Sequence, residues 1–287
     1  MLRWPKRFVL TADDLAFTPG VTRGIIALLE ANRISATGAM TNRPHWPEAS
    51  RAIAPFWGRA DIGVHLNLTA GAPLTRMGLL APSGELPKLP VILRAGLLGS
   101  LPLDEIGREF DAQLTAFEDR AGQMPDFVDG HQHVHALPGV RRALATVLAR
   151  RYTSRKPYLR DPGDRMASIR QRARYVAKAG GLAMLAQPFA RRMRDLGFAL
   201  NEGFSGYSAF DAEGDYAADF ATYLKAPGTR HLVMCHPGEI DEELRTLDPA
   251  THSRPRETEF FLSGQFQEIC QAASLEPARF SELEPMA

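Results

Sequence analysis

The sequence predicts an α/β protein, and within that class an irregular TIM-like (β/α) barrel built as a single domain over residues 1–287. Apolar runs of strand length alternate with segments of helical periodicity, which is typical of βα units on a parallel sheet. A chain of 287 residues with 45% hydrophobic content can bury one barrel-sized core, which we favour over two small domains. Polar residues with catalytic or metal-binding potential also lie at the ends of the apolar runs, and a barrel builds its active site at these strand ends.

Both kinds of element recur along the whole chain. The predicted strands are Phe8–Ala12, Ser35–Thr41, Ile62–Leu68, Phe127–Gly130, Pro157–Arg160, His231–Cys235 and Ala278–Ser281. The predicted helices are Val21–Ala31, Leu103–Arg120, Val140–Arg151, Met166–Lys178, Met184–Leu196, Tyr216–Leu224 and Glu257–Ala273. Together they indicate about seven βα repeats.

One connection is too long for an ordinary βα loop. It forms a long loop insertion at about residues 69–102, contains several prolines, and includes the apolar stretch Val91–Leu98. We interpret it either as a lid or substrate wall on the barrel mouth, or as a small packed excursion.

Composition limits the partners. The 34 Lys and Arg residues nearly balance the 33 Asp and Glu residues, so neither nucleic acid nor an anionic membrane is expected as a partner. The arginines of the segment 165–194 are spread around helical faces, which favours a solvated surface. The balanced charge fits an uncharged partner better, and the sequence leaves open whether the protein forms a homo-oligomer.

The location expected from sequence is the cytoplasm. Two cysteines, Cys235 and Cys270, are too few for a disulfide framework and fit a reducing compartment. The basic start Met1–Arg7 leads into a short strand instead of a signal-peptide core. No apolar run approaches the roughly 20 residues that span a bilayer.

The tract from Asp129 to His135 reads Asp-Gly-His-Gln-His-Val-His and is the strongest functional signal. On an extended strand, His131, His133 and His135 would share a face, and imidazole is the commonest nitrogen ligand for a divalent metal. Not all three need be ligands, because one can bind metal, another can orient it and a third can contact substrate.

Two further strand ends could complete a metal site. Asp13 and Asp14 follow the first predicted strand, where one carboxylate can bind a cation while the other stays free as a base; capping or turn formation is the alternative. His65 lies in Gly63–Leu68 and could supply a nitrogen ligand, although a lone histidine there is more often a core residue. Together these features suggest a metal-dependent hydrolase.

Arg160 ends a predicted strand, and His236 directly follows another. A guanidinium beside a catalytic carboxylate would keep that carboxylate ionised, whereas a surface salt bridge is the other interpretation of Arg160. Pro237 and Gly238 would fix the backbone of His236 at the rim. In a barrel, all these strand ends converge on one mouth.

As a set, these motifs resemble the YdjC-like carbohydrate deacetylases, the family that includes chitooligosaccharide deacetylases and the hopanoid-associated HpnK proteins. The resemblance is carried by the blocks Ala12–Asp14, Gly63–Leu68 with Gly71 and Pro73-Leu74, Asp129–His135 with Pro138, Arg160 with Pro162, Cys235–Gly238, and the later pair Arg256-Glu257. It implies an irregular TIM-like barrel that holds one divalent metal.

The resemblance also implies roles for individual residues. Asp14, His65 and His131 match the metal ligands, Asp13 the general base and His236 a general acid, with Arg160 as a further catalytic residue. Substrate contact or support of the ligands falls to Asn67, Asp129, His133 and His135. One departure is that Leu15-Ala16 replaces the usual Phe-Gly, which removes a glycine suited to positive φ and leaves the loop shape and substrate preference open.

The function expected from sequence is therefore metal-dependent removal of an acetyl group from an N-acetylated sugar, oligosaccharide or glycolipid. The ligand set suits Zn²⁺; we expect Zn²⁺ or Mg²⁺ as the metal, with Mn²⁺ and Co²⁺ also open. The alternatives are another metal-assisted ester or phosphoester hydrolase, or a catalytically silent barrel that binds a sugar or a metal.

Overall fold

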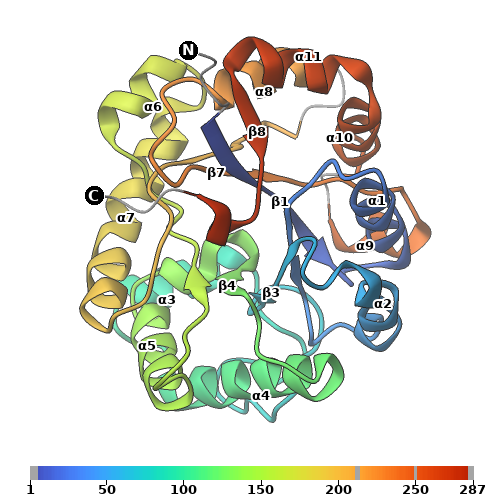
Figure 1. Cartoon of the computed structure of the whole chain (residues 1–287). Coiled ribbons are helices and arrows are strands. Elements are labelled where there is room, and N and C mark those ends of the chain that lie inside the picture. Colours follow the sequence, from blue (N-terminus) through green and yellow to red (C-terminus); the bar gives the residue numbers. More distant parts are fainter. Residues whose placement is uncertain (1–5, 211–213, 249–250, 284–287) are drawn as a thin grey trace.

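One curled parallel sheet forms the centre of the molecule, and helices surround it (Figure 1). The computed structural model describes residues 6–210, 214–248 and 251–283. The strands run in the order β5-β4-β3-β2-β1-β7-β6, and β8 also pairs with β1. Their bounds are β1 Lys6–Leu15, β2 Ala36–Ala39, β3 Asp61–Leu66, β4 Phe127–Gly130, β5 Tyr158–Leu159, β6 Phe204–Ser205, β7 Leu232–Cys235 and β8 Leu275–Pro277.

The two ends of this sheet approach each other. Leu159 of β5 forms an isolated parallel bridge with Leu200, just before β6, and its N–H donates to Ala199 O at 2.9 Å. The sheet therefore curls almost to closure, which confirms the predicted α/β fold with an irregular barrel.

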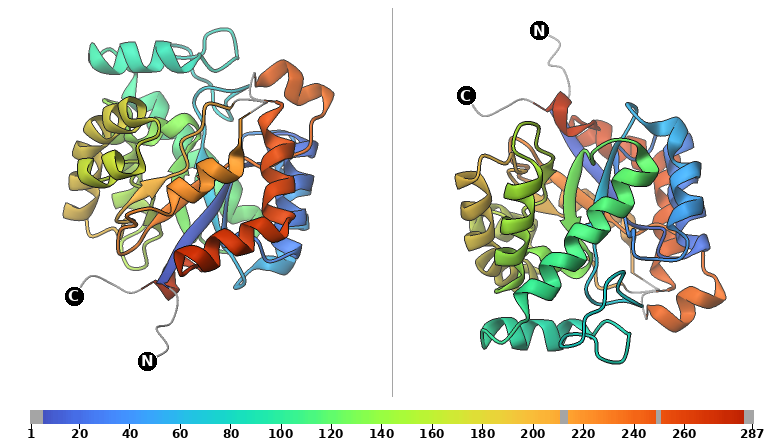
Figure 2. Two further views of the ribbon diagram at one scale, coloured as in Figure 1. Left: turned by 90° about the horizontal axis from the view of Figure 1, so that it is seen from above. Right: turned by 90° about the horizontal axis from the view of Figure 1, so that it is seen from below.

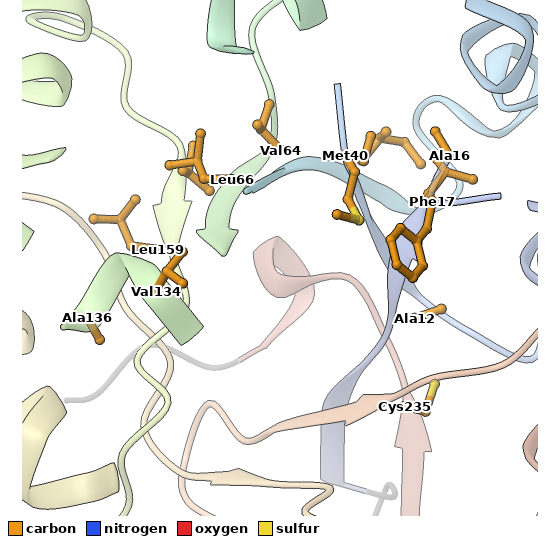
Figure 3. Packing of buried hydrophobic residues seen from close by; sticks show 14 of the residues in the cluster. Ala12, Ala16, Phe17, Met40, Val64, Leu66, Val134, Ala136, Leu159 and Cys235 are labelled. Atoms are coloured by element: carbon orange, nitrogen blue, oxygen red, sulfur yellow. The ribbon is translucent and has the colours of Figure 1, made fainter. Parts of the chain in front are cut away.

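The helices form an outer layer. They are α1 Pro19–Glu30, α2 Trp46–Ala52, α3 Leu89–Leu97, α4 Leu103–Ala121, α5 Val140–Arg151, α6 Met166–Arg172, α7 Val176–Asp195, α8 Tyr216–Tyr223, α9 Glu242–Leu247, α10 Ser253–Leu262 and α11 Gly264–Ala273. Because they cover the sheet, strands such as β3 are buried along their whole length. Figure 3 shows part of this core, with apolar side chains such as Ala12, Val64 and Leu159 from different strands.

Several predicted elements differ from the observed ones. The predicted helix Met166–Lys178 is interrupted at Ala173, whose φ of 56° ends α6, and Ser263 divides the predicted helix Glu257–Ala273 into α10 and α11. The predicted strand Ala278–Ser281 is wrong, because the last strand is Leu275–Pro277 and a 3-10 turn follows at Phe280–Glu282. Strand β6 has two residues and is too short to produce a periodic pattern.

The long connection before α4 is partly helical and is anchored to α4. The carboxylate of Glu105 accepts the N–H groups of Leu79 and Leu80, and Glu109 accepts those of Leu74 and Thr75. Figure 2 shows α3 at the end of the molecule opposite both termini, which is the end where the strands finish. The insertion is therefore a packed segment on the mouth side.

Within the three described ranges, no helix combines the length and apolar character needed to cross a membrane. Cys235 and Cys270 are both buried and free. The basic start Met1–Arg7, for which we expected no signal peptide, lies mostly outside these ranges, because residues 1–5 are not among them.

Candidate active site

A bulge at the end of β1 carries the two aspartates. Ala12 pairs with Thr37 and Leu15 pairs with Ala39, so β1 contains one residue more than β2 over this interval. Adjacent residues of a regular strand point to opposite faces, whereas a bulge re-aims its side chains. Asp14 has a φ of 71° and Ala16 a φ of 70°, so Ala16 adopts the left-handed conformation without being glycine. Both carboxylates reach the mouth of the barrel.

Asp14, His65 and His131 form a buried cluster of donor atoms. Asp14 Oδ1 lies 2.8 Å from His131 Nδ1 and 3.4 Å from His65 Nε2. One donor atom from each residue lies within 4.8 Å of the others. The other nitrogen of His65, Nδ1, lies 2.6 Å from Asp129 Oδ1, so Asp129 orients the ring with Nε2 toward the cluster. Carboxylates orient metal-binding imidazoles in this way.

Asp13, His65 and Asp129 form a second set whose donor atoms lie within 4.8 Å of one another, but a guanidinium already contacts this set. Arg160, which is fully buried, contacts Asp13 Oδ2 through Nη1 at 2.6 Å and Asp129 Oδ2 through Nη2 at 2.6 Å. The cluster around Asp14 therefore fits a cation better.

Charges around the cluster set the protonation states. Burial would raise the pKa of Asp13, but Arg160 outweighs it and lowers this pKa to about 2. Burial also opposes a charge on His65, yet Asp129 and Asp13 raise the pKa of that ring to about 10. The pKa of Asp14 is well below its usual value because His131 and Arg254 outweigh burial. Asp13 and Asp14 are thus ionised near neutral pH.

His236 is a second residue that lies near Asp13. Its Nε2 is 3.8 Å from Asp13 Oδ2, and its backbone N–H donates to Glu257 Oε2 at 2.6 Å. The His236 ring also packs against Phe210, with 5.1 Å between the ring centroids. Burial lowers the pKa of His236 to about 4, although Asp13 and Asp14 oppose this shift.

The expectation that the three histidines of the 131–135 tract share a strand face is wrong. Strand β4 ends at Gly130, and His131–Ala136 forms a 3-10 turn in which Gln132 and His133 have positive φ. Only His131 reaches the Asp14 cluster. His135 Nε2 donates to Arg160 O at 2.9 Å, and the His133 ring packs against Phe204 and Tyr207.

Asn67 has a structural environment in this fold. Its Oδ1 accepts the N–H groups of Thr69 and Ala70, and its Nδ2 donates to Ala70 O at 2.7 Å. Asn67 therefore shapes the turn that begins the long insertion.

Arg254 is a site residue that we did not predict from the sequence. Its Nη2 lies 2.7 Å from Asp14 Oδ2, although the two residues are separated by 240 positions. It belongs to α10, so it follows no strand and lacks the signal that identified the other residues.

These observations define an α/β barrel with a buried aspartate–histidine cluster at its mouth. The chain matches the YdjC-like protein family over residues 7–272, and it belongs to that family. It is 29% identical to a chitooligosaccharide deacetylase of Enterobacter sp. (strain 638), over 84% of each chain. It is 34% identical to a carbohydrate deacetylase of Homo sapiens, over 52% of this chain and 47% of that one.

A solved structure from Enterococcus faecalis is also similar. It is described as a proposed cellobiose-phosphate cleavage protein, is 22% identical, and covers 96% of this chain and 98% of its own with a TM-score of 0.73. This similarity supports the fold alone.

Proposed function

We propose that this protein is a metal-dependent carbohydrate N-deacetylase, which hydrolyses the acetamide of an N-acetylated sugar, oligosaccharide or glycolipid. The observation that carries the proposal is a donor cluster, Asp14, His65 and His131, beside a separately held carboxylate, Asp13. The names of the family relatives described above support the same activity.

The residues present fit a divalent cation. One carboxylate oxygen and two imidazole nitrogens suit Zn²⁺, with Mg²⁺, Mn²⁺ or Co²⁺ as alternatives. Four contacting carboxylates, from Asp13, Asp14, Asp129 and Asp248, outnumber the two guanidiniums of Arg160 and Arg254, and negative charge stays in excess even when the His65 ring is counted as positive. Bound there, the cation would polarise the acetamide carbonyl and favour attack by water.

The chain's own residues then handle the proton. Asp13 is ionised and accepts the proton of the attacking water as general base. We expect the proton to pass from Asp13 to His236, because His236 Nε2 is the imidazole nitrogen that lies 3.8 Å from Asp13 Oδ2. His236 protonates the amine as the C–N bond breaks, which leaves acetate and a free amino sugar.

Acetate release tests the proposal. The protein is stripped with a chelator and assayed on a panel of N-acetylated sugars, with and without each of the four metals. We expect release that depends on metal and requires Asp13. Metal-dependent cleavage of phosphoesters or simple esters, but of no acetamide, would assign a different hydrolase; sugar binding without any turnover would indicate a silent barrel.

A further inference from the structure

The two oxygens of Asp14 have different partners. Oδ1 faces His131 and His65, whereas Oδ2 lies 2.7 Å from Arg254 Nη2. Asp14 and Arg254 are each only 1% exposed, so water does not compete for this contact. Arg254 therefore contacts the carboxylate oxygen that does not face the imidazoles.

Arg254 is itself held in place. The same Nη2 lies 2.7 Å from Asp248 Oδ2, so one nitrogen bridges two carboxylates. The guanidinium carbon lies 5.9 Å from the centroid of the Phe17 ring. A Cβ at Gly238 would lie 3.5 Å from Arg254 Cδ, so the arginine stem packs closely against this glycine. The two carboxylates thus contact Nη2 of the guanidinium, while Phe17 and Gly238 pack against the rest of the side chain.

Helix α10 holds the other side of the site as well. Glu257 Oε2 accepts the His236 N–H at 2.6 Å, and Thr258 Oγ1 accepts the Gly238 N–H at 2.9 Å. One helix thus contacts both the Asp14 carboxylate and the turn that carries His236.

We propose that Arg254 is a positioning residue, which fixes Oδ2 of Asp14 so that only Oδ1 is presented to a cation held with His65 and His131. This inference rests on the proposed function, because it requires a cation at Asp14. A carboxylate held this way cannot rotate to offer both oxygens, and partners that orient a metal ligand are typically important for affinity.

Metal affinity distinguishes this orienting role from a purely electrostatic role and from a purely structural one. Orientation of Asp14 by Arg254 would strengthen cation binding, whereas the positive charge of Arg254 would weaken it. If it orients Asp14, Arg254→Met should weaken the binding of Zn²⁺ or Co²⁺ by about 10–100-fold, measured by competition with a chromophoric chelator. If it acts only as a positive charge, its loss should tighten binding by relieving repulsion. If it only stabilises the fold, affinity should stay within about twofold. Either of the last two results would overturn the inference.

Arg172→Met is the matched control. Arg172 is also a buried arginine, and its Nη1 lies 2.6 Å from Asp164 Oδ2. Its loss should lower stability without changing metal affinity. The visible spectrum of bound Co²⁺ should change in Arg254→Met and stay the same in Arg172→Met.

A second variant decides the matter if Arg254→Met does not fold. Asp248→Asn keeps the Arg254 charge but weakens its second anchor, so we expect affinity to fall by up to about 10-fold. Unchanged affinity would overturn the inference. Failure of the unsubstituted protein to bind any metal would instead overturn the proposed metal site together with the inference, so the two failures are distinguishable.

Discussion

Arg160 forms a bidentate ion pair with Asp13, in which Nη1 lies 2.6 Å from Oδ2 and Nη2 lies 2.5 Å from Oδ1. Both side chains are buried, and Arg160 also contacts Asp129. The pair therefore keeps the proposed base ionised and links it to the carboxylate that orients His65.

Asp13→Asn should separate chemistry from metal binding. The amide keeps the size of the side chain but cannot accept the water proton, so turnover should fall about 10²–10⁴-fold. Metal content, measured by atomic emission, should be unchanged because Asp13 is outside the donor cluster. Near-normal turnover in this variant would remove Asp13 from the role of base.

Arg160→Met should be strongly destabilising. Removing one partner of a buried ion pair leaves an uncompensated charge and typically costs about 3–5 kcal/mol in the free energy of unfolding. The comparison is Arg23→Met, which breaks an exposed pair with Glu239 and should change stability little. Urea unfolding of both variants provides the measurement, and equal losses would contradict the expected difference.

The histidines of the 131–135 tract should behave differently from one another. His131→Ala should lose bound metal, because His131 Nδ1 belongs to the donor cluster. His133→Phe should retain metal, because its ring already packs among aromatic side chains. Metal content after dialysis distinguishes them, and metal loss in both variants would argue for a larger ligand set.

Glu257 should make stability depend on pH. Burial raises its pKa from 4.5 to about 7, even though the His236 N–H, the Tyr216 hydroxyl and Arg254 favour the charged form, while Asp13 adds to the rise. The folded state then binds more protons than the unfolded state between these values, so stability should fall as pH rises from about 4.5 to 7. The loss attributable to Glu257 is on the order of 3 kcal/mol.

Glu257→Gln removes this titration while keeping an oxygen that can accept the His236 N–H. Urea unfolding at pH 5 and pH 7.5 should therefore show a smaller difference for this variant than for the unsubstituted protein. The same pH difference in both proteins would assign the effect to other groups.

The convergence at the mouth was predictable because parallel strands all finish at the same end. Asp14, His65 and His131 lie far apart in sequence, yet each lies at or just after the end of a strand, and that position was visible as an apolar run ending in a polar residue. The barrel topology supplied the rest of the argument.

Other features depend on backbone detail that no periodic pattern reveals. The histidine tract was misread because a two-residue period assumes an extended chain, whereas Gln132 and His133 are left-handed. The bulge that turns Asp13 and Asp14 toward the mouth is a local insertion in the register. Arg254 lies on a helix, where one more arginine is not distinctive.

The contact between Asp14 and Arg254 also bears on how the protein folds. Because 240 positions separate these two residues, their contact requires nearly the whole chain to be in its native arrangement. A partly synthesised or truncated chain would contain the ligand residues without the geometry that assembles them. Cation binding should therefore be linked to the complete fold. A free cation concentration 100 times the Kd would then raise the free energy of unfolding of the protein by about 2.7 kcal/mol.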